Sequence, residues 1–120
     1  MNENHDLIAQ HANETYAYLT TRGRVTGEPH RIEIWFGVHD GRILLMSGGR
    51  DRSDWVRNLQ SNPRVEVEIA GETFTGIATI LLESSETDHL ARTLLVTKYG
   101  KDRDLTQWGR ESLAIAIDLD

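Results

Sequence analysis

The segment SGGRDRSDWVRNL, residues 47–59, places two glycines and three arginines in a chain that is otherwise acidic. Gly48 and Gly49 allow the backbone to approach a ligand closely, and exposed amides beside arginines form a concave site for anions. Arg50 and Arg52 directly precede a predicted helix, where the helix dipole favours negative charge. The segment therefore predicts a site for phosphate or carboxylate. The alternative interpretation is a turn followed by an ordinary capped helix.

The distribution of charge agrees with an anion site. The 120 residues include 13 basic and 19 acidic side chains, which give a net charge of −6. Residues 22–64 carry a net charge of +3, so the remainder of the chain carries −9. Such asymmetry often marks the face that meets an oppositely charged ligand, although arginines also pair with carboxylates on ordinary solvated surfaces. The acidic total argues against general binding to nucleic acid or anionic membranes.

Several classes of site are excluded or disfavoured. The chain has no cysteine, which excludes disulfides, thiolate nucleophiles and cysteine-ligated metals. Its five histidines show neither H-x-x-x-H nor H-E-x-x-H spacing, so we expect no metal site. Neither a Rossmann nor a P-loop glycine motif occurs. The sequence shows no apolar run long enough to span a membrane and no signal-like leader, so we expect a cytoplasmic protein.

The elements that position the arginine-rich segment follow from hydrophobic patterning. Strands are predicted over residues 16–21 and 31–38, with a loop rich in turn residues between them. Asp40-Gly41 predicts a type I′ hairpin turn into a return strand over residues 43–47. Ser53 is expected to cap a helix that Asn62-Pro63 ends. Trp35 and Phe36 are neighbours in a predicted strand, so at least one should be buried.

The rest of the chain adds strands and a second long helix. Alternating residues 65–69 predict a strand with one wet face, and residues 73–82 predict a longer strand in which Gly76 marks a bulge or bend. A helix is predicted over residues 86–99, with Ser85 or Thr87 as its cap, and a last strand over residues 113–119. A short helix is predicted over residues 7–13. The pattern predicts a mainly β (α+β) fold, a small antiparallel β-barrel with added helices.

Three longer stretches carry a family resemblance: YLTTRGRVTGEPHRIEIWF from residue 18, ILLMSGG from residue 43 and WVRNLQSNPRVEVEI from residue 55. Their order and spacing resemble the deazaflavin-dependent nitroreductases, split-β-barrel relatives of the pyridoxamine 5′-phosphate oxidases. The resemblance covers the chain from about residue 18 to its C-terminal end. It implies one domain over residues 1–120, a split barrel of about six strands with two or three helices.

The resemblance also implies a redox cofactor held by its phosphate-bearing tail, either a deazaflavin coenzyme of the F-420 type or FMN. Family members commonly carry S-K-G-G where this chain has M-S-G-G, and Arg50 and Arg52 could supply the charge of that lysine. The number of arginines favours the longer, more anionic deazaflavin tail. The residues expected to bind the cofactor are Arg24, Thr26, Gly27, Arg31, Ser47, Gly48, Gly49, Arg50, Arg52, Trp55 and Asn58.

The implied reaction is hydride transfer from the reduced deazaflavin to a quinone, nitroaromatic or similar electron-poor small molecule, with the cofactor carrying the chemistry. Tyr99 is the candidate catalytic residue, as a proton donor beside the substrate. Trp108 is expected to seal the barrel end, and His30 lies within the predicted tail loop. Three alternatives stay open: an FMN-binding oxidase-like protein, a non-catalytic flavin, deazaflavin or haem carrier or sensor, and a dimeric interaction module without a cofactor. A homodimer is compatible with each.

Overall fold

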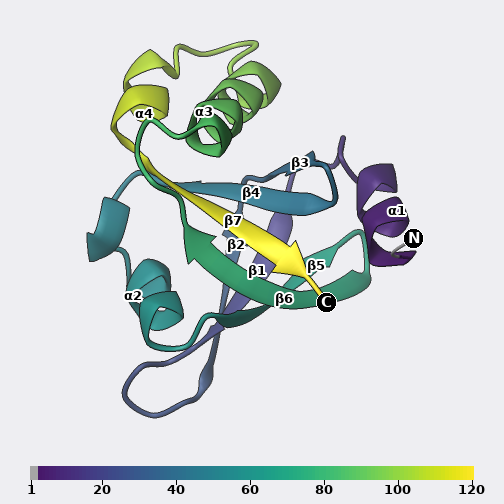
Figure 1. Cartoon of the computed structure of the whole chain (residues 1–120), viewed down its shortest axis with the longest axis vertical. Helices are drawn as coiled ribbons and strands as arrows, with labels where there is room; N and C mark the ends of the chain where they lie inside the picture. The colour runs from purple at the N-terminus through teal and green to yellow at the C-terminus, as the bar shows by residue number, and fades with distance from the viewer. Residues whose placement is uncertain (1–2) are drawn as a thin grey trace.

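The computed structural model describes residues 3–120, and its centre is one antiparallel sheet of seven strands curled into a half-barrel (Figure 1). The strands follow the order β2-β1-β5-β6-β7-β4-β3 across the sheet. Their bounds are β1 Ala17–Arg22, β2 Pro29–Ile34, β3 Gly37–His39, β4 Arg42–Ser47, β5 Arg64–Ile69, β6 Glu72–Ile80 and β7 Leu113–Leu119. The predicted split-barrel fold is confirmed.

Helices cover the ends and one side of this sheet. In Figure 1, α3 and α4 lie together beside β4 and β7, whereas α2 and α1 lie at other sides of the half-barrel. The helices are α1 Glu3–Gln10, the 3-10 helix η1 Arg50–Arg52, α2 Asp54–Ser61, α3 Glu86–Tyr99 and α4 Thr106–Glu111. None of the helices within residues 3–120 is long and apolar enough to cross a membrane.

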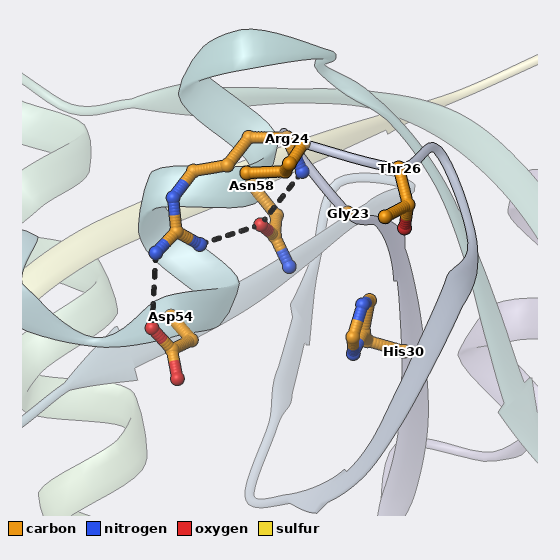
Figure 2. Close-up of a pocket in the computed structure, with 7 residues that line it drawn as sticks. Gly23, Arg24, Thr26, His30, Asp54 and Asn58 are labelled. Carbon is orange, nitrogen blue, oxygen red and sulfur yellow. Dashed lines mark hydrogen bonds and ion pairs between the residues drawn. The ribbon is translucent and has the colours of Figure 1, made fainter.

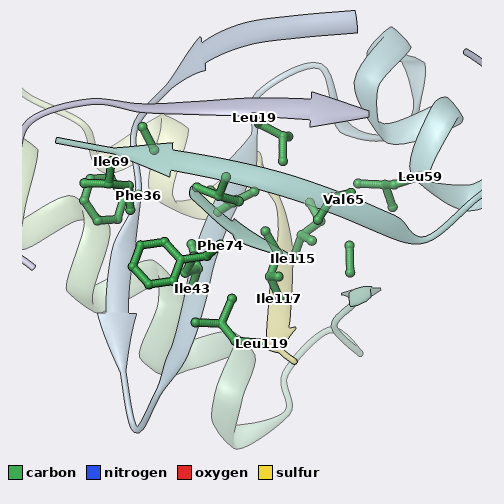
Figure 3. Close-up of a cluster of buried hydrophobic side chains, with 14 of the residues drawn as sticks. Leu19, Phe36, Ile43, Leu59, Val65, Ile69, Phe74, Ile115, Ile117 and Leu119 are labelled. Carbon is green, nitrogen blue, oxygen red and sulfur yellow. The ribbon is translucent and has the colours of Figure 1, made fainter. Parts of the chain in front are cut away.

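Strands β4 and β7 are buried on both faces, which explains their almost uninterrupted apolar sequences. Their inner face contributes to the larger core cluster, which fills the half-barrel (Figure 3). Their outer face packs against α3 in a second cluster that contains Leu44, Met46 and Leu95. By contrast, β5 alternates buried and exposed residues, as its sequence predicts.

Two hairpin turns of the sheet share one backbone conformation, and one of them is the turn predicted at Asp40-Gly41. Asp40 and Gly41 adopt φ values of 53° and 76°, and Ala70 and Gly71 adopt φ values of 51° and 83°. Two consecutive residues with positive φ form a type I′ turn, whose twist matches that of antiparallel strands. The predicted type I′ turn between β3 and β4 is therefore confirmed, and the turn between β5 and β6 is of the same type.

The predicted strand over residues 31–38 is wrong, because the chain breaks at Trp35 and Phe36 into β2 and β3. At the break, the Phe36 amide donates to the Tyr99 hydroxyl at 3.0 Å, and Lys98 Nζ donates to the Phe36 carbonyl at 3.0 Å. Side chains of α3 thus satisfy backbone groups that a neighbouring strand would otherwise pair. Phe36 is fully buried and Trp35 partly buried, so the expectation of a core residue here is confirmed.

Three further expectations need correction. The first helix spans Glu3–Gln10 instead of residues 7–13. Gly76 forms no bulge, because the register between β5 and β6 is continuous through it. A Cβ at this position would clash with the Asp118 carbonyl oxygen, so glycine permits the close approach of β7. Ser53 precedes α2 without capping it through its side chain, whereas Ser85 caps α3 as expected by accepting from the Asp88 amide at 3.2 Å.

Candidate functional site

A pocket of about 330 Å³ opens between the β1–β2 loop and α2 (Figure 2). Two backbone bonds shape the loop, since the Gly23 amide donates to the Glu28 carbonyl and the Gly27 amide to the Gly23 carbonyl, each at 2.8 Å. Gly27 has a φ of 78°, which glycine adopts without strain. The lining residues are Gly23, Arg24, Val25, Thr26, His30, Asp54 and Asn58.

Arg24 connects this loop to α2. Its backbone amide and its Nη1 both donate to Asn58 Oδ1, at 3.2 and 2.8 Å, as Figure 2 shows. Asn58 is 3% exposed and donates through Nδ2 to Thr21 Oγ1 at 3.2 Å. The Asn58 side chain therefore uses its acceptor and one donor to fix the loop, and it holds the Arg24 guanidinium at the pocket.

The remaining side of the Arg24 guanidinium meets Asp54, with Nη2 3.3 Å from Asp54 Oδ1. The Arg24 side chain is 36% exposed and that of Asp54 is 85% exposed. An ion pair this open contributes little to stability, because water screens both charges. An incoming phosphate or carboxylate can therefore take the place of Asp54 and bind Arg24 with two parallel hydrogen bonds.

The Ser47–Gly49 segment lies next to both α2 and α4. Ser47 is buried, and its hydroxyl lies 2.8 Å from Ser53 Oγ and donates to the Arg50 carbonyl at 3.0 Å. Gly48 and Gly49 are exposed. A Cβ at Gly48 would lie 3.4 Å from the Trp108 ring, and one at Gly49 would lie 2.6 Å from Ser53 Oγ. The absence of a side chain at Gly49 thus permits the close approach of Ser53, whereas the position of Gly48 leaves room for a Cβ.

Three of the predicted arginines do not line this pocket. The Arg50 guanidinium donates to the Glu111 and Ser112 carbonyls at 2.7 and 3.3 Å and pairs with Glu83 at 2.6 Å, so it fastens η1 to the start of β7. Arg31 pairs with Glu68 at 3.3 Å on strands β2 and β5. Arg52 is exposed at the end of η1 and, within residues 3–120, has no ion-pair partner.

A cluster of three aromatic side chains, Trp35, Tyr99 and Trp108, lies on the α4 side of the Ser47–Gly49 segment. The Trp35 ring stacks on the Tyr99 ring with centroids 4.3 Å apart, and Trp108 meets Trp35 edge-on at 5.5 Å. The Arg103 guanidinium lies 5.3 Å from the Trp35 ring centroid. These rings border a second pocket of about 280 Å³, which is lined by Tyr16, Glu33, Ile34, Trp35, Met46 and Trp108.

The Tyr99 hydroxyl is committed to the backbone. It accepts from the Phe36 amide at 3.0 Å and lies 2.8 and 3.1 Å from the carbonyl oxygens of Thr15 and Phe36. Burial raises the pKa of Tyr99, an effect that the Phe36 backbone partly offsets. The hydroxyl thus holds the break between β2 and β3 and keeps its proton, and its catalytic role stays a prediction.

The structure places the predicted cofactor residues in different surroundings. Arg24, Thr26 and Asn58 line the first pocket, and Gly27 shapes its loop. Trp55 packs against the main core. The prediction for Ser47, Gly48 and Gly49 as ligands stays untested, as do those for Arg31, Arg50 and Arg52.

Sequence reasoning missed Asp54 and undervalued Trp35 and Trp108 as lining residues. An acidic residue in the first turn of a helix is common, so Asp54 gave no distinct signal. The tryptophans were more readily explained by burial alone. Within residues 3–120, no three acidic or histidine side chains lie close enough together to hold a metal ion.

The family model of the F420H(2)-dependent quinone reductases matches residues 2–120, the whole of the site described above. The chain belongs to this family. Its kinship with deazaflavin-dependent enzymes, predicted from the three sequence stretches, is therefore confirmed.

Solved structures share this fold. A conserved hypothetical protein of Mycobacterium tuberculosis is 25% identical, with a TM-score of 0.77 over 99% of this chain and 81% of that one. An F-420-H2 dependent reductase is 18% identical, with a TM-score of 0.69 over 86% of this chain and 93% of that one. The haem storage protein HutZ of Vibrio cholerae is 15% identical, with a TM-score of 0.75 over 100% of this chain and 92% of that one.

Proposed function

We propose that this protein is an oxidoreductase that uses reduced deazaflavin coenzyme F-420 to reduce a quinone or a similar electron-poor small molecule. Membership of the F420H(2)-dependent quinone reductase family supports the cofactor class. The observation that carries the proposal for this chain is the solvent-exposed ion pair of Arg24 and Asp54 in the lining of the first pocket. Asn58 holds the Arg24 guanidinium in place, and the exposed Asp54 carboxylate neutralises its charge only weakly. Such a guanidinium can bind the anionic tail of a coenzyme.

The residues fit the two chemically different ends of such a coenzyme. For the phosphate-bearing tail, the first pocket offers the Arg24 guanidinium, the Thr26 hydroxyl and the His30 imidazole. Arg52 and the amides of Gly48 and Gly49 extend the donor set along the adjoining segment. For the flat ring system, the second pocket offers apolar and aromatic walls that include Trp35, Trp108 and Met46. The two pockets lie near opposite ends of the β1–β2 hairpin, and we propose that the elongated coenzyme spans the distance between them.

When bound, the reduced coenzyme supplies the hydride, and the protein contributes binding, orientation and exclusion of water. We propose that Arg24 anchors the tail. The coenzyme is then already restricted in translation and rotation when its ring meets the acceptor. Ile34, Met46 and the two tryptophans exclude water from the ring site. Tyr99 acts as a positioning residue, because its ring supports Trp35 while its hydroxyl stays bonded to the backbone.

The charge around the second pocket bears on the acceptor. Glu33 is exposed at its edge and the Tyr18 hydroxyl lies 3.4 Å from Glu33 Oε1. A carboxylate at the rim repels anionic acceptors, so we propose neutral quinones and nitroaromatics as the substrate class. The predicted nitroreductase activity, cytoplasmic location and homodimer are part of the same proposal, to be tested by assay, fractionation and light scattering.

The direct test is to titrate the purified protein with coenzyme F-420, FMN and haem in parallel, following tryptophan fluorescence and cofactor absorbance. We expect saturable binding of F-420 with a clear preference over the other two. Adding a neutral quinone such as menadione to the complex with the reduced coenzyme should then accelerate its oxidation in a saturable way. Binding without acceleration would favour the carrier, and a preference for FMN or haem would overturn the cofactor assignment.

A further inference from the structure

A third pocket, of about 530 Å³, lies where the segment after α1 meets β3 and one side of α3. Both lysines of the chain, Lys98 and Lys101, line it, although every other basic residue apart from histidine is arginine. The first and second pockets share no lining residue with this one. Its lining residues are Ala12, Asn13, Val38, Leu90, Thr93, Leu94, Thr97, Lys98 and Lys101.

Lys98 is a partly buried cation whose hydrogen-bonding capacity is not used up. Its Nζ donates to the Phe36 carbonyl at 3.0 Å and lies 3.8 Å from the Phe36 ring centroid. Burial lowers the pKa of Lys98 to about 8, against a weaker opposing effect of the Glu14 carboxylate. Within residues 3–120, no carboxylate lies within ion-pair distance of it. An ammonium has three N–H donors, and the Phe36 carbonyl accepts one of them.

The rest of the lining specifies what that ligand should look like. No acidic side chain lines the pocket, although the chain carries 19 of them. Val38, Leu90 and Leu94 form an apolar wall, and Lys101 places a second, exposed cation at the edge. The volume lies in the range of pockets that hold small molecules. The lining thus combines two lysine side chains with an apolar wall.

We propose that this pocket binds a small amphipathic carboxylate, such as a medium-chain fatty acid. The carboxylate would accept hydrogen bonds from Lys98 and Lys101, and its alkyl chain would cover Val38, Leu90 and Leu94. Binding would give Lys98 a carboxylate at ion-pair distance in addition to the more distant Glu14, which favours the charged form of a half-buried amine. The proposal is independent of the oxidoreductase function, since no residue of the first two pockets takes part in it.

The test uses octanoate as the probe and the full chain with methyl-labelled valine and leucine in NMR spectra. We expect saturable shifts of the Val38, Leu90 and Leu94 methyl signals with octanoate. Octanol, which lacks the charge, and acetate, which lacks the chain, should bind at least about tenfold more weakly. Octanoate should also raise the pKa of Lys98, measured from its side-chain signals.

Two variants and one matched control test whether Lys98 and Lys101 bind the carboxylate of octanoate. Lys98→Gln removes the charge while keeping a donor for the Phe36 carbonyl, and Lys101→Gln removes the exposed charge. Each should weaken octanoate binding about tenfold, whereas Arg110→Gln, the loss of an exposed charge on α4, should leave it unchanged. Should Lys98→Gln fail to fold, Lys101→Gln and the octanol comparison decide.

Three results would overturn the proposal. The first is the absence of methyl shifts at the three apolar residues, or shifts confined to the first two pockets. The second is equal binding of octanol and octanoate, which would leave an apolar groove without recognition of the carboxylate. The third is unchanged affinity in both lysine variants.

Discussion

The Arg24 guanidinium donates to Asn58 Oδ1 at 2.8 Å, and the Arg24 backbone amide donates to the same oxygen at 3.2 Å. One buried amide side chain thus sets both the path of the β1–β2 loop and the direction of its arginine. The guanidinium is aimed before any ligand arrives, so binding an anion there does not require Arg24 to be ordered first.

Arg24→Ala should weaken the binding of coenzyme F-420 by about 1.5 to 3 kcal/mol, because a charge-assisted hydrogen bond to the tail is lost. Fluorescence titration measures the change. Arg22→Ala is the matched control, since Arg22 is an exposed arginine two residues away that does not line the first pocket. An equal loss in both variants would mean that the coenzyme responds only to overall charge.

Asp54→Asn should change the affinity in the opposite direction. The substitution removes the carboxylate that competes with the coenzyme tail for Arg24, so binding should become severalfold tighter, and most clearly at low salt. Asp51→Asn removes another exposed charge, in η1, and should have a smaller effect. Weaker binding in Asp54→Asn would show that Asp54 itself contacts the ligand as an acceptor.

Arg50 and Arg52 should differ although they are two residues apart. Arg50→Ala removes the bonds to two carbonyls and to Glu83, so the free energy of unfolding should fall by about 1 to 2 kcal/mol. Arg52→Ala should change it by less than about 0.5 kcal/mol, because the side chain is exposed. Denaturant titrations measure both, and equal stabilities would contradict the structural role of Arg50.

Tyr99→Phe separates positioning from proton donation. The variant keeps the ring that stacks on Trp35 but loses the hydroxyl bonds to Thr15 and Phe36, so stability should fall by about 1 to 2 kcal/mol. We expect the alkaline limb of the pH profile of quinone reduction to stay unchanged, together with the KM for the quinone. Loss of that limb would identify Tyr99 as the proton donor instead.

Arg92 ties α3 to α4, because its guanidinium pairs with buried Asp88 at 3.0 Å and donates to the Gly109 carbonyl at 2.9 Å. Arg92→Met should cost about 3 kcal/mol, since it leaves the Asp88 carboxylate buried without its partner. Chemical denaturation at neutral pH measures this loss.

The same pair predicts a pH dependence. Burial alone would raise the pKa of Asp88, but the bonds from Arg92 and the Ser84 amide lower it overall. A carboxyl with a folded pKa below its unfolded value contributes stability above the unfolded pKa and loses it as the pH falls through the folded one. The native protein should therefore lose stability in acid below about pH 4, and Arg92→Met should lose less over that range.

Local sequence was sufficient for the elements whose determinants are local. The type I′ turn at Asp40-Gly41, the Ser85 cap and the alternating strand β5 follow from neighbouring residues, and all three are present. The break at residues 35–36 could not be predicted this way, because the side chains that bond its backbone, Lys98 and Tyr99, lie more than 60 positions away.

The candidate site was predictable to a similar degree. Glycines and arginines in the β1–β2 loop pointed to the first pocket, and Arg24 lies there. The sequence could not show that Arg50 faces the carbonyls of residues 111–112, since its partners are about 60 positions away in the chain. Charge and spacing predict that an anion site exists, whereas the fold decides which arginine is available to it.

The break between β2 and β3 has a mechanical consequence. These strands are consecutive in the chain yet form opposite edges of the sheet, so no ladder of inter-strand hydrogen bonds joins them. Separating them breaks no strand ladder, but it must break the bonds of Phe36 to Lys98 and Tyr99 and withdraw the fully buried Phe36 ring from the core. The two edge strands of the half-barrel are therefore joined by side-chain contacts and not by a strand ladder. The Trp35 ring, stacked on Tyr99, lies at this junction.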